Sequence, residues 1–150
     1  MRIVRVDAAA VRPLRHAVLR AGRPPAESVY PQDELVDTLH LAALTPDATV
    51  AACGTFFPEP YGDRPAWRIR GMATDAALRG QGYGSALLAE ALRLLADRDV
   101  TTVWCNARTQ ALPFYRGFGF TTVGQEFDVI GVPHYVAVLS LTGTPKGTST

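Results

Sequence analysis

Three glycines at alternate positions near the middle of the chain restrict the backbone conformation of this segment. They lie in the run from Arg79 to Ser85 (RGQGYGS), between a strand-like run, 67–74, and an apolar helix-like run, 86–96. Glycine lacks a Cβ atom, so such a loop can turn tightly and let a ligand approach its backbone. A helix that starts there directs unpaired N–H groups and the positive end of its dipole at the loop. The run therefore predicts a pyrophosphate-binding loop.

Two other phosphate-binding motifs use glycine-rich turns, and the residues around this run argue against both. A P-loop ends in Gly-Lys-Ser or Gly-Lys-Thr, because the lysine and the hydroxyl neutralise phosphates and hold magnesium. Here Gly84 is followed by Ser85 and Ala86, so the lysine is missing. A dinucleotide-binding fold needs the spacing G-x-G-x-x-G and an acidic residue about 20 positions later. Here the second spacing differs, and the next strand-like run ends in Cys105-Asn106 without a carboxylate.

The composition indicates one cytoplasmic domain. The chain has 150 residues, 47% of them hydrophobic, which suits a single domain with its own core. A net charge of +1 favours neither a nucleic-acid partner nor a membrane surface, and no apolar run is long enough to span a bilayer. The N-terminus alternates like an amphipathic strand and lacks the apolar centre of a signal peptide. Cys53 and Cys105 lie in apolar runs without metal-ligand spacing, so we expect buried free thiols.

Strand-like and helix-like runs alternate along the chain. The expected strands are 2–6, 38–44, 48–57, 67–74, 100–106, 120–129 and 134–141. The expected helices run from near Arg12 to Gly22, since Pro13 suits a first turn, then over 86–96 and over 107–115, with a helical turn near Asp33. Hairpins mixed with crossovers predict an α/β or α+β layered fold, with helices on both faces of a mixed sheet. We expect residues 1–141 to form one domain and 142–150 a disordered tail.

The glycine run also resembles the signature of the GNAT family of N-acetyltransferases, which is Arg/Gln-x-x-Gly-x-Gly/Ala at a strand–helix junction. Residues 79–84 match this signature position by position. A second segment, 106–120 (NARTQALPFYRGFGF), resembles the second motif of the family, Asn…Ala-x-x-Phe-Tyr-x-x-x-Gly-Phe. The resemblance is strong over residues 67–120 and extends more loosely over residues 1–141.

This resemblance implies a fold and a cosubstrate. The fold would be a mixed, mostly antiparallel sheet in which two central parallel strands, 67–74 and 100–106, splay apart. Acetyl-CoA would lie in the opening, where its pantetheine amides would pair with backbone groups as an added strand does. A backbone N–H near residue 72 or 73 would polarise the thioester carbonyl. The residues that the resemblance assigns to the cofactor are Met72, Ala73, Thr74, Arg79, Gly80, Gln81, Gly82, Tyr83, Gly84, Ser85, Asn106 and Phe114.

Tyr115 is the residue that the resemblance assigns to acid catalysis. The leaving thiolate needs a proton, and a phenol with an ordinary pKa of about 10 can donate one at neutral pH. The alternative is a half-buried core tyrosine whose hydroxyl has a local partner. Asn106 could bind the cofactor, cap the following helix, or do both. Phe114 would pack around the cofactor arm.

The base that takes the proton from the amine is left open. Glu126, Asp128 and His134 lie in or beside the last expected hairpin, which flanks the acceptor pocket in this family. Glu126 or His134 could be that base, or both carboxylates could be ordinary surface groups and water could accept the proton. No metal is expected, because His134 has no neighbours at metal-ligand spacing.

Together these features predict a cytoplasmic enzyme that moves the acetyl group of acetyl-CoA directly to a primary amine in a ternary complex. The acceptor, a small molecule or a peptide, is left open. Arg68 and Arg70 could recognise an acidic acceptor or pair with Glu59 or Asp63. The alternatives are a non-catalytic acyl-CoA-binding or sensing module and a small nucleotide-binding domain. No nucleic-acid or membrane partner is expected, and a homodimer stays open.

Overall fold

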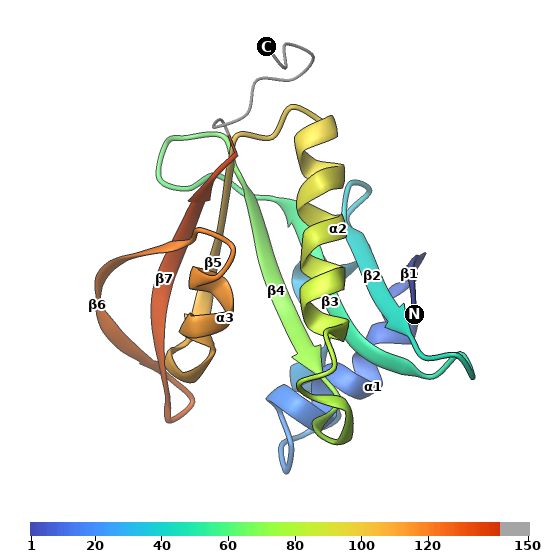
Figure 1. The fold of residues 1–150 in the computed structure, drawn as a ribbon. Helices are drawn as coiled ribbons and strands as arrows, with labels where there is room; N and C mark the ends of the chain where they lie inside the picture. Colours follow the sequence, from blue (N-terminus) through green and yellow to red (C-terminus); the bar gives the residue numbers. More distant parts are fainter. Residues whose placement is uncertain (142–150) are drawn as a thin grey trace. The chain divides into compact units, whose positions relative to one another are not determined.

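A computed structural model describes residues 1–141 of the chain (Figure 1). Its strands are β1 (Arg2–Val6), β2 (Leu39–Leu44), β3 (Val50–Pro58), β4 (Trp67–Thr74), β5 (Thr102–Arg108), β6 (Thr121–Val129) and β7 (Val132–Ser140). Its α-helices are α1 (Ala8–Leu19), α2 (Tyr83–Asp97) and α3 (Leu112–Arg116). The strands form a mixed sheet in the order β1-β2-β3-β4-β5-β7-β6, so the predicted α/β fold is confirmed. Over these residues, none of the helices has the length and apolar character needed to cross a membrane.

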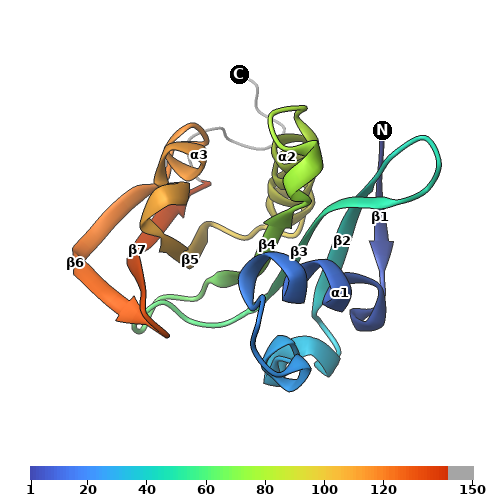
Figure 2. The same cartoon turned by 90° about the horizontal axis from the view of Figure 1, so that it is seen from below.

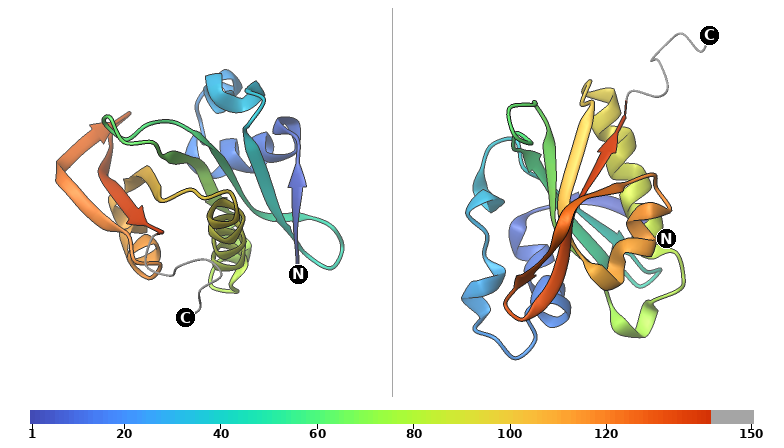
Figure 3. Two further views of the ribbon diagram at one scale, coloured as in Figure 1. Left: turned by 90° about the horizontal axis from the view of Figure 1, so that it is seen from above. Right: turned by 90° about the vertical axis from the view of Figure 1, so that its left-hand side faces the viewer.

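By its internal packing the chain divides into two compact units. The first combines Met1–Phe57 with Arg70–Leu95, and the second combines Pro58–Ile69 with the described residues from Ala96 onward. In the first unit, α1 and α2 cover opposite faces of strands β1 to β4 (Figures 2 and 3). In the second unit, β5, β7 and β6 pair in antiparallel fashion, and α3 packs against β5.

Each unit has its own apolar core. In the first, α1 packs on the sheet around three buried residues, Val11, Cys53 and Ala73. Helix α2 buries Leu87, Leu88, Ala91 and Leu95, which recur at helical spacing. The core of the second unit contains Val103, Cys105, Leu112, Tyr115, Phe120 and Leu139.

The predicted central parallel pair is present. Strand β4 pairs in parallel with β5, and the paired residues are Trp67–Ile69 of β4 and Val103–Cys105 of β5. Both strands continue past this ladder, β4 to Thr74 and β5 to Arg108.

The start of α1 differs from the prediction. The helix begins at Ala8, so Pro13 lies inside it rather than in its first turn. The Asp7 carboxylate accepts a hydrogen bond from the Ala10 N–H at 3.0 Å and caps the helix. Ala8 and Val11 are buried. The cap and this packing together outweigh the cost of an interior proline.

The predicted tail, residues 142–150, lies outside the described residues.

The structure of residues 107–115 differs from the predicted helix, because β5 runs two residues further than expected. A short 3₁₀ turn, Thr109–Ala111, and then α3 take its place.

Candidate active site

The glycine run joins β4 to α2, as the sequence predicted. Asp75 ends the strand: its N–H donates to the Ala51 carbonyl at 2.8 Å, and its carboxylate accepts from the Ala77 N–H at 2.9 Å. One 3₁₀ turn, Ala76–Leu78, leads from there into the run. These contacts connect the start of the loop to the sheet of the first unit.

Gly80 and Gly82 are the positions where this loop depends on glycine. Their φ angles are +80° and +88°, in the left-handed region that L side chains rarely adopt. A Cβ atom at either position would meet nothing within 4 Å, so the backbone conformation, not lack of space, requires glycine. Helix α2 starts at Tyr83, three residues earlier than predicted, and the Ala86 N–H donates to the Gly82 carbonyl at 3.0 Å. The N–H groups of the first turn therefore face the loop.

The other residues of the run differ in their solvent exposure. Arg79, Gln81 and Ser85 are exposed, whereas Tyr83 and Gly84 are buried. Burial of Tyr83 and Gly84 explains why the helix begins inside the glycine run rather than after it.

The last three residues of β4, Met72–Thr74, follow a second glycine in the left-handed conformation. Gly71 has a φ of +68°, and a Cβ atom there would lie 2.8 Å from Arg15 Nε and 3.3 Å from Tyr30 Cε2. Both the backbone conformation and the packing thus require glycine at this position. Ala73 is 5% exposed and belongs to the core, whereas its neighbours on either side are half-buried.

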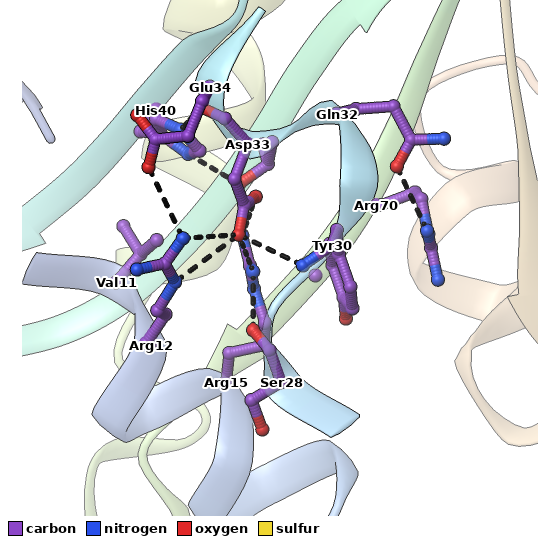
Figure 4. Close-up of polar contacts among 12 residues, drawn as sticks. Val11, Arg12, Arg15, Ser28, Tyr30, Gln32, Asp33, Glu34, His40 and Arg70 are labelled. Carbon is purple, nitrogen blue, oxygen red and sulfur yellow. Dashed lines mark hydrogen bonds and ion pairs between the residues drawn. The ribbon is translucent and has the colours of Figure 1, made fainter. Parts of the chain in front are cut away.

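A buried ion pair, which the sequence analysis missed, lies beside this end of β4 (Figure 4). The side chains of Arg15 and Asp33 are both fully buried, and their two hydrogen bonds measure 2.9 and 3.1 Å. Arg15 also donates to the Thr55 hydroxyl and to the Ser28 carbonyl, each at 2.7 Å. A buried charge pair is tolerated when further hydrogen bonds of this kind satisfy it.

The Asp33 carboxylate accepts hydrogen bonds from several donors. Its Oδ2 atom accepts from Arg12 Nη2 and from the Tyr30 N–H, each at 3.1 Å. Burial alone would raise the pKa of Asp33, but the bonds from Arg15, Tyr30 and Arg12 outweigh burial and hold its pKa below the ordinary value. His40 is buried, and its ring nitrogens lie 2.8 Å from the Thr55 hydroxyl and 3.0 Å from the Asp33 carbonyl oxygen.

The two arginines of β4 have different surroundings. Arg68 forms an ion pair with Glu59 at 3.3 Å and lies over the ring of Trp104, which agrees with one of the two alternatives from the sequence. Arg70 lies over the ring of Tyr30 and donates to Gln32 Oε1 at 3.1 Å.

Tyr115 lies in the core of the second unit. It is 6% exposed, and its ring meets those of Phe114 and Phe120 edge-on at 5.2 and 5.3 Å. Burial, with the adjacent Cys105 thiol to which it is hydrogen-bonded, raises the pKa of Tyr115 well above its ordinary value. The phenol is therefore protonated at neutral pH, as both an acid and a core tyrosine would be.

Both cysteines are free and buried, as predicted. Burial raises the pKa of Cys53 and Cys105 to about 12, so almost no thiolate forms at pH 8. We expect an aromatic disulfide reagent to leave both thiols unmodified in the native protein and to modify both within seconds in guanidinium chloride. The measurement is reagent absorbance with time, and fast labelling of the native protein would contradict the burial described here.

Asn106 lies within β5, opposite Val136 of β7, and is half-buried. The strand continues to Arg108, and Arg108 precedes the next turn at its cap position. The suggestion that Asn106 caps the following helix is therefore wrong. Its predicted contact with the cofactor stays a prediction.

Two of the three candidate bases are exposed carboxylates with local partners. Glu126 accepts from the Thr109 hydroxyl at 2.8 Å. Asp128 accepts from the Gly131 N–H at 2.9 Å, which stabilises the turn between β6 and β7. Asp128 thus has a structural role that its sequence position alone did not indicate.

The third candidate, His134, is 8% exposed and stacks on Phe127 with ring centroids 5.9 Å apart. Its Nδ1 atom lies 2.8 Å from the Val132 carbonyl oxygen. A carbonyl oxygen only accepts, so Nδ1 must donate, and the Nε2 atom of the neutral ring keeps its lone pair. The geometry thus leaves Nε2 able to accept a proton.

Comparison with known proteins identifies the family. Residues 10–120 match the Acetyltransferase (GNAT) family. Over 136 residues, which cover 89% of this chain and 91% of the relative, the chain is 30% identical to YitI of Bacillus subtilis (strain 168), an uncharacterized N-acetyltransferase. The fold is similar to Escherichia coli ElaA, with a TM-score of 0.76, 22% identity, and coverage of 91% of this chain and 97% of that one. An aminoglycoside 6'-N-acetyltransferase complexed with coenzyme A also has a TM-score of 0.76, at 13% identity and coverage of 97% and 99%.

The chain therefore belongs to the GNAT family of acetyltransferases, and it is an acyltransferase enzyme. The resemblance stated from the two sequence motifs is confirmed. The matched region includes the glycine run, Met72–Thr74 and Tyr115, and it ends before the β6–β7 hairpin.

Proposed function

We propose that residues 1–141 form one acetyltransferase domain, which transfers the acetyl group of acetyl-CoA to a primary amine on a small molecule or a peptide. The observation that carries this proposal is the loop in which Gly80 and Gly82 adopt left-handed conformations directly before the first turn of α2. Backbone N–H groups at the start of a helix suit a pyrophosphate. The family membership and the coenzyme A complex of one structural neighbour support the same ligand.

In this proposal the backbone from Arg79 to Ser85 binds the diphosphate, and the exposed Arg79 side chain adds a charge-assisted contact. Met72, Ala73 and Thr74 offer backbone groups to the amides of the pantetheine arm, and Asn106 and Phe114 complete the cofactor contacts. A backbone N–H of Met72 or Ala73 stabilises the oxyanion that forms when the amine attacks, an effect of about 3 kcal/mol in other acyl transfers.

The proton transfers need an acid and a base. We assign the acid to Tyr115, which is protonated at neutral pH and can donate to the leaving thiolate. For the base, Glu126 and His134 stay candidates. The hydrogen bond of His134 Nδ1 to the Val132 carbonyl leaves the lone pair of the neutral ring on Nε2, and this favours the histidine.

The test is a thiol-release assay in which acetyl-CoA is mixed with a panel of chemically diverse amines. Amine-dependent release of coenzyme A, with an acetylated product seen by mass spectrometry, supports the proposal. Binding of acetyl-CoA without turnover of any amine would support the second candidate, a non-catalytic acyl-CoA-binding module. The burial of the Tyr115 hydroxyl against Cys105 is the observation that favours this second candidate.

A glycine substitution tests the loop itself. We expect Gly82→Ala to weaken acetyl-CoA binding about 10-fold, because alanine at a φ of +88° costs about 1–2 kcal/mol and shifts the backbone amides. The matched control is Gly62→Ala, which places the same residue at a φ of +62° in another loop that also has open space. Calorimetric titration with acetyl-CoA should separate the two variants, and equal affinities would argue against the loop as the diphosphate site.

A further inference from the structure

We infer that three buried side chains of the first unit orient the backbone N–H of Met72, one of the two groups proposed to stabilise the oxyanion. The three are Arg15, Tyr30 and Cys53, and each acts through the neighbouring Gly71. They are therefore positioning residues rather than catalytic ones. This inference rests on the proposed function and adds to it the residues that set the direction of the donor.

Arg15 and Tyr30 occupy the space beside Gly71 that a side chain would fill. A Cβ atom at Gly71 would lie 2.8 Å from Arg15 Nε and 3.3 Å from Tyr30 Cε2. The Arg15 Nε atom is buried and has no hydrogen-bond partner in the described part of the chain, so its contact with Gly71 is one of packing. A rotation of the backbone at Gly71 would have to displace one of these two side chains.

Both side chains are themselves fixed (Figure 4). Arg15 is held by the buried ion pair with Asp33 at 2.9 Å and by its hydrogen bond to the Thr55 hydroxyl at 2.7 Å. Its guanidinium carbon lies 3.8 Å from the centre of the Tyr30 ring. The Tyr30 N–H donates to the Asp33 carboxylate at 3.1 Å. The surface against which Gly71 packs is thus rigid before any ligand binds.

Cys53 acts on the other side of Gly71, at its carbonyl group. The Cys53 sulfur lies 3.6 Å from the Gly71 carbonyl oxygen and 3.8 Å from that of Val11. The raised pKa of Cys53 keeps the thiol protonated, so the sulfur can donate a weak hydrogen bond. In a trans peptide the N–H points opposite to the C=O. The Met72 N–H is therefore directed away from Cys53 and from the core around it.

The end of β4 gives independent support for this direction. The Asp75 N–H donates to the Ala51 carbonyl of β3. Successive N–H groups of an extended strand point to opposite sides, so the Ala73 N–H also faces β3 and the Met72 N–H faces the opposite side. The geometry thus selects Met72 over Ala73 as the donor. A donor of this kind is effective only when its direction is set in advance, and a displacement of about 1 Å can cost about 100-fold in rate.

The experiment compares two pairs of variants. Cys53→Ala removes the thiol and Tyr30→Leu removes the ring that meets Gly71, whereas Cys53→Ser keeps a donor and Tyr30→Phe keeps the ring. We expect kcat per folded protein to fall about 10-fold in Cys53→Ala and Tyr30→Leu, with the Kd for acetyl-CoA changed less than about 3-fold, because the donor is displaced and the diphosphate loop is not. The two conservative variants should recover kcat to within about 3-fold of the wild type. Urea unfolding gives the folded fraction of each variant.

Val11→Ala is the matched control. It removes buried methyl groups from the core that Val11 shares with Cys53, so it should lower the free energy of unfolding and leave kcat per folded protein unchanged. A kcat that falls equally in Val11→Ala and Cys53→Ala would show a general effect of core packing and would overturn the inference.

A second readout does not depend on turnover. NMR residual dipolar couplings measure the direction of the Met72 N–H in the free protein, with the N–H groups of α2 as the reference. The Met72 coupling should change in Cys53→Ala and Tyr30→Leu and should stay at the wild-type value in the conservative variants and in Val11→Ala. This result supports the inference even when no amine is acetylated, in which case the proposed function has failed and the orientation of Met72 has not. Wild-type couplings in Cys53→Ala and Tyr30→Leu, or changed couplings with wild-type kcat, overturn the inference and leave the proposed function standing.

Discussion

Asp33→Asn should lower the free energy of unfolding by about 3–5 kcal/mol, the range for breaking a buried ion pair by removing one partner. The variant leaves the Arg15 guanidinium fully buried without a carboxylate, although the two side chains keep nearly the same shape. Urea unfolding followed by fluorescence measures the change. Glu34→Gln is the matched control, because its side chain is 80% exposed and it removes a carboxylate from the same segment; its effect should stay below about 1 kcal/mol.

The same carboxylate should make stability depend on pH. The pKa of Asp33 in the folded protein is below its ordinary value, so its contribution is complete at neutral pH and decreases as the pH falls through the unfolded value of about 3.9 toward the folded one. Asp33→Asn should therefore lose less stability than the wild type between pH 5 and pH 2. Parallel stability curves for the two proteins over that range would contradict the account of the ion pair.

Tyr115→Phe should lower kcat about 100-fold and change the Kd for acetyl-CoA less than about 2-fold, as expected when a general acid is lost. Phenylalanine keeps the edge-on contact with Phe120 and loses the hydroxyl that contacts Cys105, so the fold should be preserved. Steady-state kinetics with any acceptor found in the thiol-release assay, combined with calorimetry, measures both constants. Tyr61→Phe, in the same unit, is the control and should keep wild-type turnover.

The pH profile gives a second criterion for the acid. Since the pKa of Tyr115 is raised well above 10, the wild-type kcat should not fall through loss of this proton at any pH below about 10. Unchanged turnover in Tyr115→Phe would remove the acid role and leave the phenol as a packing residue of the second core.

Much of the fold followed from local patterns in the sequence. The bounds of β1 and β4 were predicted as observed, because alternating or β-branched runs between turn residues indicate strands directly. The glycine run indicated its loop because left-handed backbone strongly favours glycine. The helix starts at Ala8 and Tyr83 were predicted too late, since each depends on burial against the sheet, which no local pattern reports.

The buried cluster could not be derived in the same way. Arg15 and Asp33 are 18 residues apart and meet through tertiary packing. One signal was present: Arg15 falls one helical turn after Val11, on the apolar face of α1, where a charged residue needs a buried partner. The identity of that partner, and the stacking of Tyr30 between two arginines, depend on where the segment after α1 folds back.

The division of the chain into two units has a practical consequence for experiments. The boundaries fall after Phe57, Ile69 and Leu95, so neither unit is one continuous stretch, and the middle boundary cuts through strand β4. Deleting strand β1 or strand β7 would remove part of a unit and break its own strand pairing. To obtain one unit by itself, its two segments would have to be produced as separate fragments that assemble, or rejoined through a new linker.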